Sequence, residues 1–334
     1  MKHMLKTIST AYGPTGREDC VANVIRAIVA PYVDDTKIDA MGNLIAVKHG
    51  KEGGKRIMLA AHMDHIGFVV THIDEKGFAR IHNAGGISKT NSTFRRVVFE
   101  NGVNGIVAAE PEPPADKLLP RNDRLLTDMY IDLGVSSKAE AEALISVGDF
   151  AVYAPEFFEL GGDLVAGTAM DDRAGCAIVA EALKRLGDTE NEVIAVFTVQ
   201  EEVGLRGAQA AAYDVQPDIG IALDVTPAGD VPKEDRFHVR LGDGIAVKIM
   251  DKSVICHQSV VRALENAAQK SGAKYQREVL IAGGTDTAAI QKSRGGVPCG
   301  ALSIPCRYVH SACETVSLGD LESGVQVLCA FLSE

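Results

Sequence analysis

The chain has 334 residues, of which 46% are hydrophobic and 24% are charged. This length exceeds the roughly 100–200 residues of one ordinary domain, and the apolar content argues against a disordered chain. The formal net charge of −11 disfavours nucleic acids and anionic membranes as partners, because neither would be attracted over long range.

The first predicted elements are a helix and two strands. Thr15-Gly-Arg-Glu18 fits a capping box, and VANVIRAIVAPYV follows with helical spacing. Strands are expected over about residues 43–49 and 56–61, and the second of them runs into His62. Their nearly continuous apolar runs are typical of strands that are buried on both faces of a sheet.

From about residue 67 the sequence changes to short β-rich segments. GFVVTHI, FARIHN, RRVVFE and GIVAAE are separated by glycine and asparagine turns, and the proline-rich EPEPPADK is expected to be an exposed loop. We predict a β-rich inserted domain over residues 67–155. It would divide a catalytic α/β domain into residues 1–66 and 156–334.

The α/β pattern resumes near residue 165. RAGCAIVAEALKRL and SVVRALENAAQKSG are predicted helices, and EVIAVFTV, IGIALDV and CGALSIPC are predicted strands. Strands that alternate with helices indicate a mostly parallel sheet with helices on both faces. The predicted fold class is therefore α/β, with this sheet interrupted by the small β-rich domain.

The cysteines and the apolar segments predict the cellular location. Seven irregularly spaced cysteines without a C-x-x-C pair are typical of reduced, buried thiols. The start of the chain lacks the apolar region of a secretory signal, and no apolar stretch approaches the roughly 20 residues that span a bilayer. We expect a soluble, cytoplasmic protein.

Carboxylate and imidazole side chains stand at the ends of the predicted strands and at the start of one helix. They are His62, Asp64, Asp171, Asp172, Glu201, Glu202, Asp224 and His310. In open parallel sheets, ligands bind outside the carboxyl ends of the strands. Each residue alone has a structural explanation; Asp172, for example, can cap the helix that follows it. Their shared position favours a site.

Two spacings in this set have chemical meaning. Residues two apart in an extended chain point to the same face, so Asp64 can accept the free N–H of His62 while the other imidazole nitrogen binds a metal. Glu201 and Glu202 are adjacent and diverge in extended geometry. One can bind a metal while the other faces a water or the substrate, which suits a metallohydrolase.

At these residues the sequence resembles the M42 family of metallo-aminopeptidases, the glutamyl-aminopeptidase, TET-like and FrvX-like group. The motifs that carry the resemblance are GPTG at 13–16, AHMDHIGF at 61–68, AMDDRAG at 169–175, VQEEVGLRGA at 199–208, ALDV at 222–225, GGTD at 283–286 and VHSACE at 309–314. The resemblance covers nearly the whole chain. It implies a zinc-peptidase-like α/β domain, a dimerisation role for the insert, and a dinuclear metal centre.

The resemblance also implies a role for each candidate residue. The metal ligands would be Asp171, bridging both metals, His62 and Asp224 on one metal, and Glu202 and His310 on the other. Glu201 would be the general base, and Asp64 would orient His62.

The chain departs from many relatives at three positions that are not proposed ligands. At His65, Asp172 and Ala312 those relatives have Glu, Asn and Pro. His65 adds an imidazole near the site, so a relative's substrate preference is not transferred to this chain. Gly283–Asp286 is expected either to line the substrate pocket or to form a turn without a catalytic role, and Cys176 is expected in the core.

The predicted function is a metal-dependent aminopeptidase that removes the N-terminal residue from peptides with a free N-terminus. Carboxylate and imidazole ligands without a thiolate suit Zn, Co, Mn or Ni, and Zn and Co are the leading candidates. A metal-bridging water would be the nucleophile, and Glu201 would take its proton. The insert predicts a homodimer, and the resemblance adds a tetrahedral dodecamer.

Three alternatives stay open. A deacylase of N-blocked amino acids or peptides would keep the metal centre but reject a free α-amine. A glycoside hydrolase is disfavoured because Glu201 and Glu202 are too close to flank one glycosidic bond, and a chain with 5% aromatic residues and no tryptophan has few rings for stacking sugars. A non-catalytic scaffold is disfavoured because the ligand set and Glu201 are intact.

Overall fold

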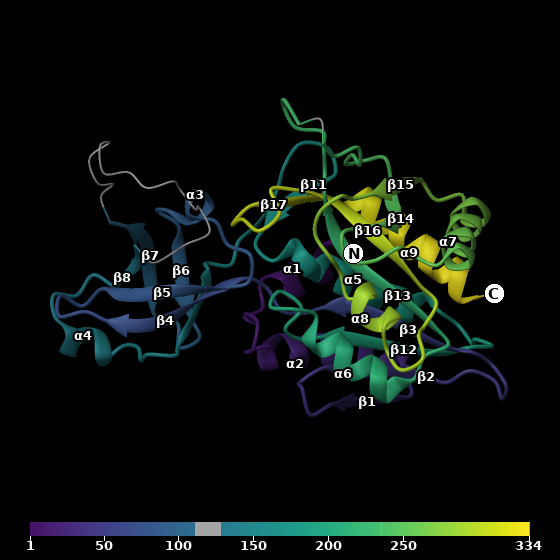
Figure 1. The fold of residues 1–334 in the computed structure, drawn as a ribbon, viewed down its shortest axis with the longest axis horizontal. Helices are drawn as coiled ribbons and strands as arrows, with labels where there is room; N and C mark the ends of the chain where they lie inside the picture. The colour runs from purple at the N-terminus through teal and green to yellow at the C-terminus, as the bar shows by residue number, and fades with distance from the viewer. Residues whose placement is uncertain (111–127, 235, 334) are drawn as a thin grey trace.

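The computed structural model describes residues 1–110, 128–234 and 236–333. An α/β domain built on one large sheet lies beside a smaller β-barrel (Figure 1). Apart from its first residue, the segment EPEPPADK lies outside the described residues. In the described part of the chain, no helix has both the length and the apolar character needed to cross a membrane.

An 11-stranded sheet forms the centre of the α/β domain in the described residues. Its strands are β1 (Asp35–Ile38), β2 (Leu44–Lys48), β3 (Arg56–His62), β10 (Phe157–Glu159), β11 (Leu164–Gly167), β12 (Glu192–Thr198), β13 (Ile219–Pro227), β14 (Ile245–Met250), β15 (Tyr275–Val279), β16 (Cys299–Arg307) and β17 (Glu314–Ser317). The order is β1-β2-β12-β3-β13-β16-β17-β11-β10, with β14 paired to β16 and β15 paired to β14.

The centre of this sheet is parallel. Strands β12, β3, β13 and β16 run parallel to one another, which confirms the predicted fold class. The pairs at both ends of the main path, from β1 to β12 and from β16 to β10, are antiparallel. The alternation of strands and helices could not reveal these edges, because they include neighbours without a crossover helix between them.

Helices cover both faces of the sheet. One hydrophobic core includes α1 (Lys2–Ser9), α2 (Asp19–Val29), α5 (Met170–Arg185), α7 (Gln258–Ser271) and α9 (Leu318–Leu332). The other includes α6 (Arg206–Val215) and α8 (Thr287–Gln291). Along β3, Leu59 belongs to the first core and Met58 to the second, because successive side chains point to opposite faces.

The barrel interrupts the α/β domain after β3. Its strands, in order around the barrel, are β4 (Gly67–Ile73), β5 (Ala79–Ala84), β8 (Met129–Asp132), β7 (Asn104–Ala109), β6 (Arg96–Phe99) and β9 (Phe150–Tyr153), with the short helices α3 (Lys89–Ser92) and α4 (Lys138–Glu142) between strands. It has its own core, where the rings of Phe68 and Tyr153 meet edge to face at 5.6 Å. The predicted β-rich insert is confirmed, whereas its boundaries and its dimerisation role stay predictions.

The predicted capping box at Thr15–Glu18 is wrong. Helix α2 begins at Asp19, and Glu18 is its N-cap residue without a side-chain capping bond to the described residues. The backbone turns before the helix, since the N–H of Arg17 donates to the carbonyl of Pro14 at 2.8 Å. The Glu18 carboxylate is used elsewhere in the molecule, as described below.

The cysteines are free thiols, as expected for a reduced protein. Four of the seven, Cys176, Cys256, Cys299 and Cys306, are buried, but Cys20 is exposed. Cys176 lies in the core with its Sγ 3.2 Å from the carbonyl of His62.

Candidate metal centre

The predicted ligands meet at the carboxyl ends of the parallel strands. His62 is the last residue of β3, and Asp224 lies in β13, which continues two residues further than predicted. Glu202 follows β12, His310 follows β16, and Asp171 stands at the start of α5. In the part of the chain that the structure describes, two groups can hold a metal ion: His62, Asp171 and Asp224, and Asp171, Glu202 and His310.

Asp171 belongs to both groups. Its Oδ1 lies 3.0 Å from Nε2 of His62, and its Oδ2 lies 3.2 Å from Nε2 of His310. Asp224 Oδ1 is 3.7 Å from the same nitrogen of His62, and Glu202 Oε2 is 3.2 Å from that of His310. Each oxygen of Asp171 therefore faces a different group.

The chemistry of these groups fits divalent cations. Asp171, Glu202 and Asp224 bring three carboxylates into a small, mostly buried space. Oε1 of Glu202 is buried and has no hydrogen-bond partner among the described residues. Burying carboxylates without full compensation is costly, and bound cations would supply that compensation.

The pKa values at the centre reflect burial and close opposite charges. Burial acts to raise the pKa of Asp171, but hydrogen bonds with His310 and His62 outweigh it and hold this pKa below its usual value. Burial raises the pKa of Asp224 to about 6. Against the effect of burial, the facing carboxylates raise the pKa of both imidazoles. Protons and metal ions would therefore compete for the centre.

Asp64 lies beneath the centre and contacts it in two ways. Nδ1 of His62 is 3.0 Å from the backbone carbonyl of Asp64 and 3.6 Å from its carboxylate, so the carbonyl is the nearer acceptor. The carboxylate accepts the backbone N–H groups of Glu201 at 3.0 Å and Glu202 at 3.2 Å. Asp64 thus holds the loop with both glutamates, which the spacing argument did not predict.

A cavity of about 450 Å³ opens over these groups. It is lined by the five candidate ligands, Glu201, Gly86, Val225, Pro227, Lys248, Leu280, Ala282, Gly283, Gly284, Thr285 and Val309. Three residues of the GGTD motif therefore line the cavity. The fourth, Asp286, is buried and accepts a hydrogen bond of 2.5 Å from Thr198, and burial raises its pKa to about 7.

Glu314 holds the backbone of two proposed ligands, and it was not among the residues predicted from the sequence. Its Oε2 accepts the N–H of Asp171 at 3.0 Å, and its Oε1 accepts the N–H of His310 at 2.7 Å. Burial, followed by the charge of Asp171, raises its pKa to about 8. Its position at the end of the VHSACE motif was the available signal.

Lys248 was also missed. It lines the cavity from the apolar strand β14, is almost fully buried, and forms ion pairs with Glu278 at 3.0 Å and Asp251 at 3.5 Å. A lysine in the middle of the run IAVKIM was a visible signal, because a buried lysine needs a charged partner.

His65 and Asp172 take structural positions. Nδ1 of His65 lies 2.8 Å from the carbonyl of Ile66, and burial, followed by the charge of Arg173, lowers its pKa to about 3. Oδ1 of Asp172 accepts the N–H of Gly175 at 3.0 Å, which is the capping contact expected at the start of a helix.

The chain is similar to known proteins along most of its length. A family model described as M42 glutamyl aminopeptidase matches residues 42–327. The chain is 46% identical over 328 residues to a protein of Acetivibrio thermocellus named "Putative aminopeptidase", covering 98% of this chain and 97% of that protein.

Two solved structures are similar over almost the full length. Aminopeptidase APDkam598 from the archaeon Desulfurococcus kamchatkensis is 38% identical with a TM-score of 0.93, covering 99% of this chain and 94% of that one. The TET1 peptidase of Pyrococcus horikoshii, described as able to assemble into a tetrahedron or a large octahedral shell, is 35% identical with a TM-score of 0.86 and 99% coverage of both chains.

Proposed function

The chain belongs to the M42 glutamyl aminopeptidase family of metallo-hydrolases, and on that premise we propose that it removes the N-terminal residue from peptides at a centre for two divalent metal ions. The observation that carries this proposal is the position of Asp171, whose two oxygens each face a different histidine. A carboxylate shared in this way supports a two-metal centre over a mononuclear one.

Five side chains would hold the two metals. They are His62 and Asp224 on one metal, Glu202 and His310 on the other, and Asp171 on both. This donor set suits Zn or Co, with Mn and Ni as further candidates. When bound, the metals would polarise the scissile carbonyl and make a water molecule more acidic.

Glu201 would take the proton of the attacking water and pass it to the leaving amine. It lines the same cavity as the ligands, and burial raises its pKa, which makes its carboxylate a stronger base. Asp64 supports this role because its carboxylate accepts the N–H of Glu201. The contacts between Asp64 and Nδ1 of His62 support the second role of Asp64, to orient that ligand.

The lining of the cavity supports a substrate with a free N-terminus. Several carboxylates line it, and they would attract a positively charged α-amine. Leu280, Ala282 and Val309 add an apolar part that could contact the side chain of the N-terminal residue. An acylated N-terminus lacks the positive charge, so the deacylase alternative has less support.

The test combines metal replacement with a substrate panel. The protein would be stripped with a chelator, refilled separately with Zn, Co or Mn, and assayed on peptides with free or acetylated N-termini. We expect metal-dependent release of single residues from free N-termini only. Cleavage of the acetylated set alone would replace the proposal by the deacylase, and no cleavage despite full metal uptake would refute a peptidase.

We also propose that the chain forms homo-oligomers through the β-rich insert, which would cover residues 67–155. The catalytic domain would then consist of two parts, residues 1–66 and 156–334. The similar TET1 peptidase assembles into closed shells, which supports a dimer or a dodecamer here. Native mass spectrometry of the full chain would distinguish these, and a monomer at micromolar concentration would contradict the proposal.

A further inference from the structure

We propose that Glu18 is a positioning residue for the general base: it fixes the turn after β12 from which Glu201 projects. This inference rests on the proposed function, because the role of Glu201 does. Glu18 is 182 positions away from Gln200, the residue it holds.

The turn after β12 is held by carboxylates of other segments. Three consecutive N–H groups donate to them: Gln200 to Glu18 at 3.1 Å, Glu201 to Asp64 at 3.0 Å, and Glu202 to Asp64 at 3.2 Å. Gln200 has a φ of 54°, a left-handed conformation that a residue other than glycine rarely adopts without support. Glu18 therefore anchors the turn at its least favourable residue.

The Glu18 carboxylate is buried, with 7% of the residue exposed. Its Oε1 accepts the N–H of Gly16 at 2.7 Å as well as that of Gln200. The Glu18 side chain does not cap α2, so helix capping does not explain why its carboxylate is buried. A buried carboxylate costs free energy, and the bonds to these two N–H groups offset part of that cost. Burial, followed by the charge of Asp64, still raises the pKa of Glu18 to about 7.

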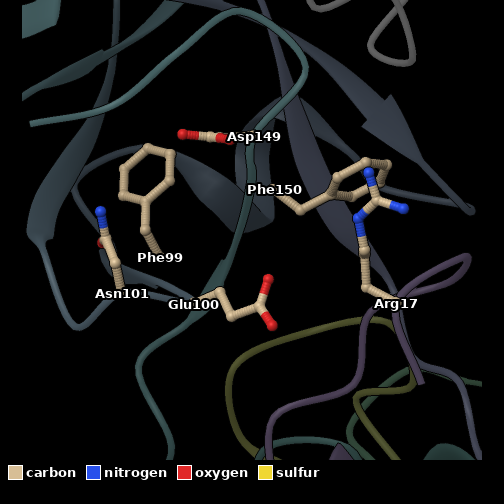
Figure 2. Close-up of a pocket in the computed structure, with 6 residues that line it drawn as sticks. All are labelled: Arg17, Phe99, Glu100, Asn101, Asp149 and Phe150. Atoms are coloured by element: carbon tan, nitrogen blue, oxygen red, sulfur yellow. The ribbon is translucent and has the colours of Figure 1, made fainter. Parts of the chain in front are cut away.

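The segment that carries Glu18 is itself fixed on two sides. Toward the centre, the N–H of Thr15 donates to the carbonyl of His65 at 3.1 Å. Toward the barrel, the guanidinium of Arg17 lies 5.4 Å from the centroid of the Phe150 ring, beside a cavity of about 250 Å³ (Figure 2). Glu18 is thus presented by a supported segment, as preorganised sites require.

Loss of this anchor should affect turnover more than binding. A general base must stay within hydrogen-bond reach of the proton it takes, and a displacement of about 1 Å can lower the rate about a hundredfold. Substrate contacts made by Leu280 or Gly283 lie on other segments of the cavity and would be retained.

The experiment compares Glu18→Ala with Glu18→Gln, whose amide oxygen can still accept both N–H groups. In the metal-loaded enzyme we expect Glu18→Ala to lower kcat about tenfold to a hundredfold at nearly unchanged KM and metal content. Glu18→Gln should stay within about threefold of the wild-type kcat. Hydrogen exchange of a peptide covering residues 199–205 should be faster in Glu18→Ala and near wild type in Glu18→Gln.

Asp320→Ala is a matched control. Asp320 is a buried carboxylate that accepts the N–H groups of Gly242 and Gly244, each at 2.8 Å, and it does not line the catalytic cavity. Its removal should lower thermal stability while kcat stays near that of the wild type.

Each outcome decides the proposal. Wild-type kcat and exchange in Glu18→Ala would overturn it, as would equal impairment in Glu18→Gln. If Glu18→Ala does not fold, Glu18→Asp, which withdraws the carboxylate by one methylene, takes its place with the same expectations. A wild type without peptidase activity would refute the proposed function alone, since the exchange difference still tests the anchor.

Discussion

At the candidate metal centre, some carboxylates are not proposed ligands. They accept hydrogen bonds from the backbone N–H groups of the proposed ligands. Glu314 accepts the N–H groups of Asp171 and His310, and Asp64 accepts that of Glu202. Each of these hydrogen bonds fixes the direction of one backbone N–H group. The positions of the proposed ligands therefore depend on Glu314 and Asp64, which are not proposed to contact the metals.

Replacement of Glu201 tests the central chemical assignment. Glu201→Gln keeps the shape of the side chain but cannot accept a proton, so we expect kcat to fall about a hundredfold or more. Metal content, measured by mass spectrometry of the dialysed protein, should be unchanged because Glu201 is not a proposed ligand. Full turnover with both metals bound would rule out Glu201 as the base.

His65 predicts a pH dependence of stability. Its pKa is about 3 in the folded protein, against a usual value of 6.5, so the unfolded chain binds the proton more tightly. The lowered pKa of His65 therefore contributes stability that is present above pH 6.5. This contribution is lost as the pH falls toward 3, by at most about 1.4 kcal/mol per pH unit. We expect the stability difference between wild type and His65→Gln to shrink from pH 7 to pH 5.

Urea unfolding of both proteins in excess chelator would measure this difference at a constant metal state. The glutamine amide can still donate to the carbonyl of Ile66, which Nδ1 of His65 contacts at 2.8 Å. A difference that stays constant with pH would show that His65 does not titrate in this range.

At the scale of elements, α5 connects the metal centre to the N-terminal helix. The fully buried guanidinium of Arg173 donates to the carbonyls of Ile8 at 2.6 Å, Ala11 at 3.2 Å and Gly13 at 3.2 Å. These carbonyls lie at the end of α1 and just beyond it, where helix geometry leaves acceptors unpaired. Backbone N–H groups also reach two of them, from Ala11 to Ile8 at 3.3 Å and from His65 to Gly13 at 3.2 Å, so Arg173 adds to these contacts and ties α5 to the end of α1.

Removal of this connection should destabilise the fold. Arg173→Met removes three hydrogen bonds made by a buried guanidinium, although the carbonyls of Ile8 and Gly13 each keep one backbone N–H donor, and we expect a loss of about 3 kcal/mol or more in the free energy of unfolding. Arg185→Met near the other end of α5 is the matched control, since its ion pairs with Glu322 and Glu181 are partly exposed and should contribute about 1 kcal/mol or less. Equal losses in urea unfolding would contradict the prediction.

The elements also show where local patterns succeed. The apolar runs predicted β3, β12, β13 and β16 because these strands are buried on both faces. The capping box failed because its glutamate is used by Gln200, a residue that no local pattern connects to it. Short edge strands such as β10 carry too few residues to show a period.

At the scale of the whole molecule, the fold brings carboxylate and imidazole groups from five segments to one place. Metal ions that bind this folded arrangement and not the unfolded chain must stabilise it. We expect chelator treatment to lower the unfolding temperature by several degrees and refilling to restore it, since a ligand at a hundredfold excess over its Kd contributes about 2.7 kcal/mol per site. Calorimetry with and without chelator measures this.

The His62→Ala variant is the control for that experiment. It lacks one proposed ligand, so its unfolding temperature should respond less to chelator than that of the wild type. An equal response in both proteins would show that the stabilising metal binds elsewhere.

The sequence by itself determined which side chains meet. Carboxylates and histidines at the ends of apolar strands are brought to one edge of a parallel sheet by the topology, so His62, Glu202, Asp224 and His310 could be named in advance as candidates. Asp171 was a candidate at the start of a helix, and the resemblance to the M42 family selected these five as ligands from the eight candidates. Only the tertiary structure decided what holds them: Glu314 on Asp171 and His310, the carboxylate of Asp64 on Glu202, and the carbonyl of Asp64 on His62. The physical reason is that strand patterns are local, whereas a hydrogen bond between distant segments depends on how the chain packs and has no period in the sequence.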